Sequence, residues 1–149
     1  MSAALHLAGP EDLDKLMTLV AAFHAEDGID SDADSRQAGI APLLTGSPYG
    51  AVYLIGPTRA PVGYVVVTFG WSVEFGGMDG FVDELYIRPP VRGRGIASQV
   101  LSDLPNALAE AGVKALHLEV DRENEAAQRL YGRSRFRMRD RYVLMTRLL

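Results

Sequence analysis

Two glycines and two arginines in one short loop form the segment of the 149-residue chain that is best suited to binding chemistry. The segment follows the apolar residues 85–87 and runs through Arg92, Gly93, Arg94, Gly95, Ile96 and Ala97. Glycine lets the backbone approach a ligand where a side chain would clash. A helix beginning near Ile96 would direct free amide hydrogens and its positive dipole end at an anion. The loop therefore indicates a pyrophosphate site, although a strand-to-helix turn also uses glycine for steric reasons alone.

A second set of residues shares one face of the helix predicted over residues 123–133. Asn124, Ala127 and Tyr131 are spaced three, four and seven residues apart, which places them on the same side of a helix. Small Ala127 would leave room for a ligand, and Asn124 and Tyr131 could hydrogen-bond to it. Each of the two polar residues also has an ordinary structural interpretation, since asparagine caps helices and tyrosine packs at core edges.

Two adjacent carboxylates, Asp83 and Glu84, precede the glycine-rich loop in a predicted strand. Strand alternation places Glu84 on the same face as Tyr86. Asp83 shares the opposite face with Leu85 and Ile87 unless a bulge shifts the register. Because Leu85 and Ile87 have the character of core residues, Glu84 is favoured over Asp83 as the group that faces a ligand. Solvated or salt-bridged carboxylates are the alternative.

The spacing of apolar residues predicts an α/β chain in the order strand, two helices, three antiparallel strands, helix, strand, helix, strand. Pro105 is expected to kink or break the third helix locally, because proline removes a backbone hydrogen bond. The strands are predicted over residues 3–7, 49–55, 62–71, 81–88, 115–120 and 142–149, and the helices from the start signal at 9–12 to 27, then over 36–44, 96–111 and 123–133.

Residues 82–97 and 119–136 together resemble the GNAT superfamily of acetyl-coenzyme A-dependent N-acetyltransferases. The loop from Arg92 to Ala97 fills every fixed position of that family's pattern R/Q-x-x-G-x-G/A. The later pattern N-x-x-A-x-x-L-Y-x-x-x-G-F is matched except at its glycine, where this chain has Arg135. That departure implies a differently shaped turn after the last helix.

The resemblance implies one GNAT domain over residues 1–149, with a mixed, mostly antiparallel twisted sheet of six to seven strands and about four helices. It implies acetyl-coenzyme A as cofactor, Glu84 or Asp83 as the base toward an amine, and Tyr131 as the acid toward the departing thiolate. The residues implied to bind the cofactor are Leu85, Tyr86, Ile87, Arg92, Gly93, Arg94, Gly95, Ile96, Ala97, Ser98, Asn124, Ala127 and Tyr131.

The acceptor is expected to be a primary amine of a small molecule or peptide, and a polyamine, an amino acid, an antibiotic amine and a protein amino terminus all remain open. Candidate acceptor residues lie near the end of the first helix and at a predicted hairpin; they are Phe23, His24, Glu26, Trp71, Glu74 and Phe75. A non-catalytic acyl-coenzyme A sensor of the same fold is the rival hypothesis. A Rossmann-type nucleotide domain fails on topology, because its phosphate loop follows an early parallel strand.

Composition excludes several other classes of protein. The content of 48% hydrophobic and 23% charged residues is typical of a globular domain, and we expect neither a membrane span nor a secretory signal. The chain has no cysteine, and its three histidines are too dispersed to predict a metal site. Its net charge of −4 argues against nucleic acid as the main partner. A cytoplasmic location is the default expectation, and a homodimer through the last strand is a hypothesis.

Overall fold

The computed structural model describes residues 4–149 and divides into two compact units, Met1–Glu119 and Val120–Leu149. The first unit contains the whole sheet and three α-helices, and the second contains the last helix and the chain that follows it. The expectation of a single domain over residues 1–149 stays a prediction, and position 3 of the first predicted strand lies outside the described residues.

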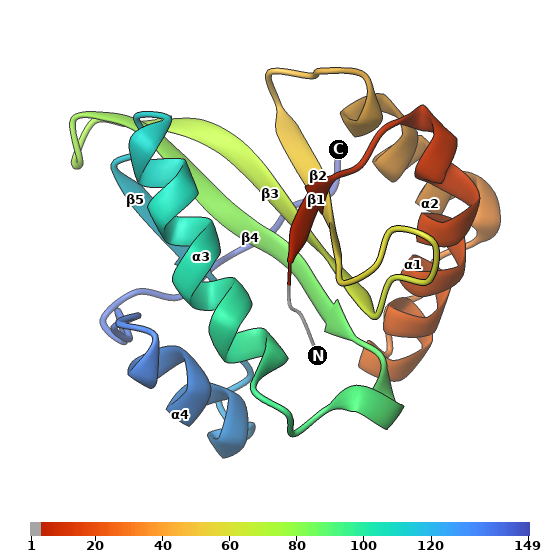
Figure 1. Cartoon of the computed structure of the whole chain (residues 1–149). Helices are drawn as coiled ribbons and strands as arrows, with labels where there is room; N and C mark the ends of the chain where they lie inside the picture. Colours follow the sequence, from red (N-terminus) through yellow and green to blue (C-terminus); the bar gives the residue numbers. More distant parts are fainter. Residues whose placement is uncertain (1–3) are drawn as a thin grey trace. The chain divides into compact units, whose positions relative to one another are not determined.

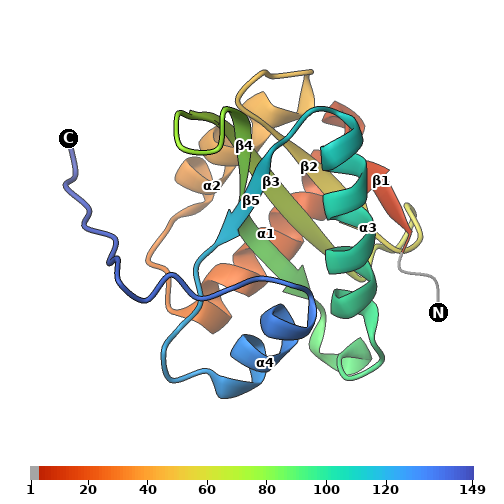
Figure 2. The same ribbon diagram turned by 90° about the vertical axis from the view of Figure 1, so that its left-hand side faces the viewer.

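The sheet of the first unit has five strands in the spatial order of the sequence (Figure 1). Three antiparallel pairings are followed by one parallel pairing at the last strand (Figure 2). The mixed, mostly antiparallel α/β architecture is therefore confirmed, whereas the predicted strand count of six to seven is wrong. The strands are β1 (Leu5–Leu7), β2 (Gly50–Ile55), β3 (Gly63–Ser72), β4 (Gly77–Ile87) and β5 (Ala115–Leu118).

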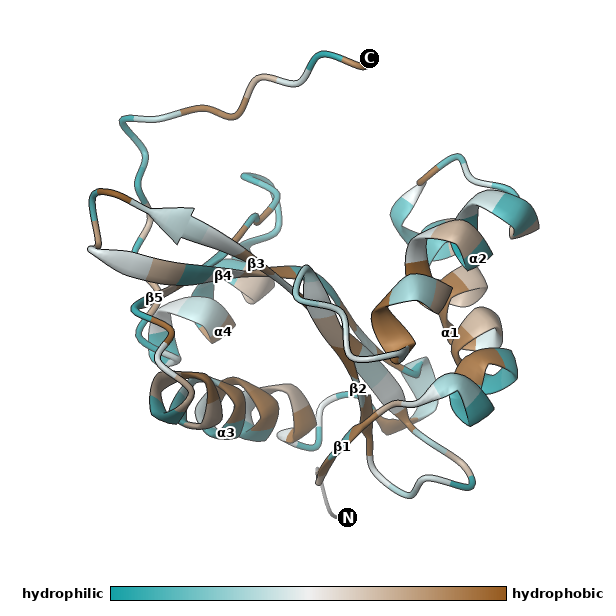
Figure 3. Cartoon of the chain, turned by 90° about the horizontal axis from the view of Figure 1, so that it is seen from above, coloured by the Kyte–Doolittle hydropathy of each residue, from teal (hydrophilic) through white to brown (hydrophobic). Residues whose placement is uncertain are grey.

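Helices cover both faces of this sheet (Figure 3). One face packs against α3 (Ile96–Glu110), whose Val100, Leu104 and Leu108 are buried against strand residues such as Val65 and Val67. The other face packs against α1 (Leu13–Asp27) and α2 (Ala33–Ile40), through Leu16 and Val20 among others. Short 3-10 turns flank these helices at Pro10–Asp12, Ala41–Leu44 and Pro89–Val91.

Two helices differ from the prediction at proline. The helix expected over residues 36–44 begins earlier, where Asp32 caps it, and gives way to a 3-10 turn at Ala41 because Pro42 cannot continue the α-helical hydrogen bonds. Helix α3 instead runs unbroken through Pro105. Within residues 4–149, no helix is long and apolar enough to cross a membrane.

A β-bulge in β4 determines which side chains face which helix. Val66 of β3 pairs with Glu84 and the next residue, Val67, pairs with Val82, so Asp83 is an extra residue without a partner across the ladder. Val82 lies in the core beneath α3. Beyond the bulge, Tyr86 lies in the core beneath α1 and α2. Glu84 and Tyr86 thus face α1, as the bulge-free alternation had also placed them together.

The second unit is built around α4 (Glu125–Arg133), which ends in a Schellman turn. The amide of Phe136 donates to the carbonyl of Tyr131 at 3.0 Å, and the amide of Arg135 donates to that of Gly132 at 3.1 Å. The Phe136 and Tyr131 rings pack edge to face at 6.1 Å, the apolar contact that usually accompanies this turn. Arg135 occupies the left-handed position with φ of 72°. The turn has the form that glycine favours, even though arginine supplies it.

The predicted strand over residues 142–149 does not form, and this prediction is wrong. Tyr142, Val143, Leu144 and Met145 are all more than half exposed. A strand obtains its backbone hydrogen bonds from a neighbour, and within the described unit this segment pairs with none. One contact of this segment is local, since the guanidinium of Arg139 lies 5.2 Å from the centre of the Tyr142 ring.

Replacing Arg135 by glycine should stabilise the end of α4. A residue with a side chain in the left-handed region costs about 1–2 kcal/mol, and the extra chain entropy of glycine returns part of that, so the net gain is about 0.5–1 kcal/mol. In the Arg135→Gly variant, the backbone amides of positions 134–136 should exchange their hydrogens more slowly than in the unmodified protein.

The matched control is Arg129→Gly, which places the same substitution six residues earlier, in the interior of α4. It should speed exchange, because glycine in a helix interior costs about 1 kcal/mol relative to alanine. Equal effects of the two variants would contradict the strained-turn interpretation.

Candidate active site

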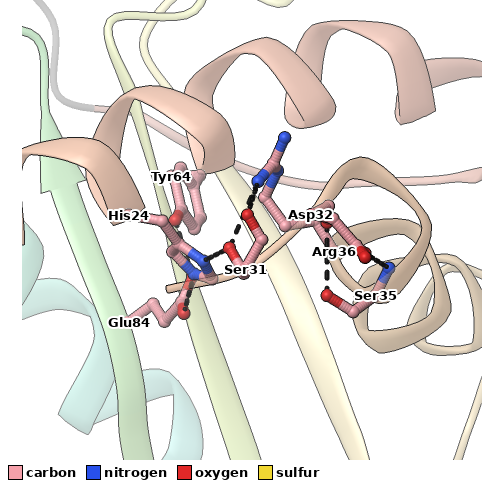
Figure 4. Close-up of polar contacts among 7 residues, drawn as sticks. All are labelled: His24, Ser31, Asp32, Ser35, Arg36, Tyr64 and Glu84. Carbon is pink, nitrogen blue, oxygen red and sulfur yellow. Dashed lines mark hydrogen bonds and ion pairs between the residues drawn. The ribbon is translucent and has the colours of Figure 1, made fainter. Parts of the chain in front are cut away.

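The Glu84 carboxylate is the centre of a polar cluster beneath the end of α1 (Figure 4). Its Oε1 accepts a hydrogen bond from the Tyr64 hydroxyl at 2.6 Å, and its Oε2 lies 2.6 Å from His24 Nε2. The Glu84 and His24 side chains are only 15% and 13% exposed. The structure therefore brings together Glu84 and His24, which the sequence singled out separately.

Packing of aromatic rings fixes the position of this cluster. Phe23 lies edge to face against Tyr64 and tilted against Tyr86, with ring centres 6.4 and 5.9 Å apart. Burial, together with the hydrogen bond and charge of Glu84, raises the pKa of Tyr64 far above its usual range. Tyr64 is consequently a permanent donor to the carboxylate.

Asp83 occupies the bulge next to Glu84 and has a different environment. Desolvation raises the pKa of Asp83, the nearby charges of Glu84 and Glu119 raise it further, and His24 opposes the shift. The side chain is nevertheless solvent-exposed and makes no ladder pairing. Asp83 is thus a carboxylate whose ionisation the folded chain opposes.

The bulge also marks the point where β5 stops pairing with β4. The last parallel pair is Val82 with Leu118. The Arg88 amide bonds to the carbonyl of Val62 on the β3 side, so by alternation the Leu85 and Ile87 amides point to the other side. On that side of β4, away from β3, no strand of the described first unit pairs with the residues after Val82. The backbone of residues 85–87 thus offers an edge to a ligand.

Both glycines of the glycine-rich loop adopt the left-handed backbone conformation that glycine favours. Gly93 and Gly95 have φ values of 77° and 78°, and a side chain built on either would meet nothing within 4 Å. Helix α3 begins at Ile96 with no capping side chain, so its first amides, including those of Ala97 and Ser98, remain available to a ligand.

The two arginines of the loop have separate environments. Arg92 forms a two-pronged ion pair with Glu26 of α1, with both N–O distances 2.6 Å, and its Nε donates to the Ile87 carbonyl at 2.8 Å. The guanidinium hydrogen bond with Arg92 lowers the pKa of Glu26. Arg92 and Glu26 thus tie the loop to α1, while the Arg94 side chain is exposed.

In the second unit, α4 carries the predicted cofactor residues on one face. Asn124 caps the helix, its Oδ1 accepting from the Ala127 amide at 3.0 Å. Only the side-chain NH₂ of Asn124 can therefore donate to a ligand. Tyr131 lies two turns along the same face, so the spacing of the three residues is realised on one helix.

The predicted acceptor residues fall into two separate groups. Phe23, His24 and Glu26 lie at the end of α1, beside Glu84 and the loop. Trp71, Glu74 and Phe75 lie at the β3–β4 hairpin, and Trp71 is 77% exposed. Trp71 is five residues along β3 from the partner of Glu84, on the order of 17 Å at the usual rise of a strand. The structure does not bring the two groups together.

His117 belongs to the hairpin end of the sheet. Its ring packs against Phe75 and Phe81, and its Nε2 lies 3.1 Å from Asp79 Oδ2. His117 is therefore a packed histidine at this end of the sheet.

Three members of the Glu84 cluster were missed by sequence reasoning: Tyr64, Ser31 and Arg36. Tyr64 has the pattern of an ordinary strand aromatic, and Ser31 and Arg36 lie in a polar stretch that indicated only a connection and a helix start. No spacing in the sequence relates these residues to Glu84, because β-strand register and the path of the α1–α2 connection bring them there.

Comparison with known proteins agrees with this fold. Residues 14–136 match the acetyltransferase (GNAT) family. The chain is 39% identical over 57 residues to the N-alpha-acetyltransferase MAK3 of Arabidopsis thaliana, and 32% identical over 77 residues to the acetyltransferase SG1711 of Sodalis glossinidius. These matches cover 38% and 50% of this chain, and 30% and 54% of the two relatives.

A solved structure with similarity over nearly the whole chain is an integron cassette protein from the mobile metagenome of Cole Harbour Salt Marsh. It has a TM-score of 0.85 and 30% identity, covering 97% of this chain and 90% of its own. The protein belongs to the GNAT acetyltransferase family, because the family match spans most of its length.

Asp83→Asn should stabilise the folded protein at neutral pH. Because the folded-state pKa of Asp83 is raised above its ordinary value of 3.8, folding loses stability as the pH rises through both values, and the full penalty is present above them. The asparagine variant should therefore show a higher Tm at pH 7, with the difference shrinking as the pH falls toward 4.

Asp103→Asn is the control, since Asp103 is an exposed aspartate on α3. Its Tm should match that of the unmodified protein at both pH values. A Tm gain for Asp83→Asn that persisted unchanged at low pH would point to packing rather than to charge.

Proposed function

We propose that the protein transfers an acetyl group from acetyl-coenzyme A to a primary amine of a small molecule or peptide. The observation that carries the proposal is the placement of the Glu84 cluster at β4, directly before the edge at residues 85–87 and the glycine-rich loop that leads into α3. Family membership and the names of the relatives support it.

The residues present suit coenzyme A as the cofactor. The open space over Gly93 and Gly95 and the uncapped start of α3 fit a pyrophosphate, which the backbone amides and Arg94 would hold. The free edge of β4 suits the amide-bearing arm of the cofactor. When bound, acetyl-coenzyme A supplies the activated acyl thioester.

The chain's own residues handle protons and charge. An aliphatic amine has a pKa near that of lysine, about 10.4, so it must lose a proton before it can attack a carbonyl carbon. We assign that proton to the Glu84 cluster, with the exposed Asp83 as the alternative. The Ile87 amide, on the free side of β4, would stabilise negative charge on the carbonyl oxygen. Tyr131 of α4 would return a proton to the thiolate.

The acceptor class stays broad in this proposal. The end of α1 contributes Phe23, His24 and Glu26 beside the cluster, which suits a cationic group approaching an acidic and aromatic surface. Because Glu26 is paired with Arg92, its charge is already largely compensated. A cytoplasmic location and a homodimer remain predictions.

A thiol-release assay with acetyl-coenzyme A over a panel of primary amines tests the proposal. The panel should include a polyamine, an amino acid, an aminoglycoside and a peptide amino terminus. We expect turnover with at least one acceptor, and Gly95→Ala should abolish cofactor binding, since a side chain at this position would occupy the space left for phosphate.

Gly112→Ala is the matched control, because Gly112 also has positive φ (95°) and open space, at the other end of α3. Both variants carry similar backbone strain, and only Gly95→Ala should lose affinity in a calorimetric titration with coenzyme A. Tight cofactor binding without turnover on any amine would favour the sensor hypothesis.

Tyr131→Phe should lower kcat by on the order of 10²-fold, with little change in the affinity for acetyl-coenzyme A, because the hydroxyl acts on the departing thiolate rather than in binding. Steady-state kinetics with the best acceptor, together with the cofactor titration, measure both quantities.

Tyr142→Phe, in the exposed chain after α4, is the control and should keep full kcat. Unchanged turnover in Tyr131→Phe would remove this residue as the acid.

A further inference from the structure

Both ring nitrogens of His24 are held by partners from different parts of the chain (Figure 4). Nε2 lies 2.6 Å from Glu84 Oε2 on β4, and Nδ1 lies 2.7 Å from Ser31 Oγ in the connection between α1 and α2. The resulting row of serine, histidine and carboxylate is the arrangement by which a histidine is oriented as a base toward a hydroxyl.

The remaining partners fix the direction of the hydrogen bonds. Arg36 Nη1 donates to the Ser31 carbonyl at 2.6 Å and to Ser31 Oγ at 3.2 Å, and a guanidinium can only donate. The hydrogen of the Ser31 hydroxyl can therefore point to His24 Nδ1. A neutral His24 with its hydrogen on Nε2 then donates to Glu84, a tautomer assigned from this network.

We propose that His24 Nδ1 is the atom that receives the proton of the acceptor amine, passed through the Ser31 hydroxyl, while Glu84 orients the ring and stabilises its positive charge. The inference rests on the proposed acetyltransferase function and refines the proton acceptor within the Glu84 cluster. His24 is then the base, and Glu84 is a positioning residue.

The step balances without any further reactant. The ammonium N–H bond breaks as a proton passes to Ser31 Oγ, and the hydroxyl proton of Ser31 moves to His24 Nδ1. Ser31 ends as a neutral hydroxyl, the amine becomes neutral, and the imidazolium donates from Nε2 to Glu84 and from Nδ1 to Ser31. The electron pair released on nitrogen is the one that attacks the acyl carbon.

The hydrogen-bond geometry favours His24 over Glu84 as the group that holds the proton taken from the amine. A proton on Oε1 would oppose the Tyr64 hydroxyl, and one on Oε2 would oppose the hydrogen of His24 Nε2. The Ser31 hydroxyl can instead reverse from donor to acceptor while Arg36 holds its oxygen in place.

Titratable and charged groups approach His24 from each element packed around it. Glu84 and Asp83 come from β4, Tyr64 comes from β3, and Arg36 comes from α2. The two carboxylates and the Tyr64 hydroxyl thus lie on the sheet side of the ring, and the Arg36 guanidinium lies beyond Ser31.

Ser31→Ala breaks the relay and should separate it from a structural role. At pH 7, kcat/KM for the amine should fall by on the order of 10²-fold, the usual contribution of a positioned base. Near pH 10 about 30% of an amine with a pKa of about 10.4 is already neutral, against less than about 0.1% at pH 7, so the loss should shrink to less than about 10-fold. The KM for acetyl-coenzyme A should not change.

Ser31→Thr keeps a hydroxyl and should retain most activity at both pH values. Ser35→Ala is the matched control, because Ser35 lies nearby and bonds Asp32 rather than His24 (Figure 4). A loss in Ser31→Ala that is equal at pH 7 and pH 10 would overturn the proposal in favour of a structural role, and no loss would overturn it outright.

A second measurement does not depend on turnover, so it separates this proposal from the proposed function. With only three histidines in the chain, ¹⁵N NMR can assign the His24 ring by comparison with His24→Gln. Near pH 7 we expect the neutral ring to carry its hydrogen on Nε2 and the Nδ1 shift to change in Ser31→Ala. A hydrogen on Nδ1 in the neutral ring would contradict the relay even if acetyl transfer is confirmed.

Discussion

The extra residue at Asp83 in β4 is the constraint from which the arrangement of the site follows. It lets Val82 face α3 while Glu84 and Tyr86 face α1, two positions that strict alternation from Val82 would have reversed. It also coincides with the last pair between β4 and β5. One inserted residue therefore buries a carboxylate beneath α1. On the edge of β4 away from β3, the Leu85 and Ile87 amides have no strand partner within the described first unit.

The end of α1 contacts both β4 and the glycine-rich loop, and these contacts differ in how much they stabilise the fold. Phe23 packs in the aromatic cluster and His24 bonds the largely buried Glu84, so both are fixed by groups withdrawn from water. The ion pair between Glu26 and Arg92 is nearly half exposed, and such pairs contribute at most about 1 kcal/mol. Packing and the buried hydrogen bonds hold α1 on the sheet, and the ion pair adds a weaker contact to the loop.

The sequence predicted the features that depend on neighbouring residues, such as turns and helix starts. It did not predict the features that depend on how distant segments pair. Positions 93 and 95 have the positive φ that glycine permits, and α3 begins directly after them as predicted. By contrast, Tyr64 and Ser31 join Glu84 through pairing of distant segments, which no local pattern encodes. The strand predicted at residues 142–149 failed for the same reason, since apolar composition supplies β-propensity and cannot supply a partner strand. At Arg135 the sequence predicted a differently shaped turn, yet the turn that ends α4 keeps the form that glycine favours, with arginine in the left-handed position.

Engagement of Arg92 changes how the loop can bind a pyrophosphate. Its guanidinium already donates to Glu26 and to the Ile87 carbonyl, and it lies 5.5 Å from the centre of the Tyr86 ring. Using Arg92 for phosphate would require breaking both contacts, so under the proposed function the amides at the start of α3 would hold the anion, with Arg94 as the nearby exposed cation. Arg92 instead positions the loop relative to β4 and α1. Arg92, the first residue of the glycine-rich pattern, thus has a structural role in this chain.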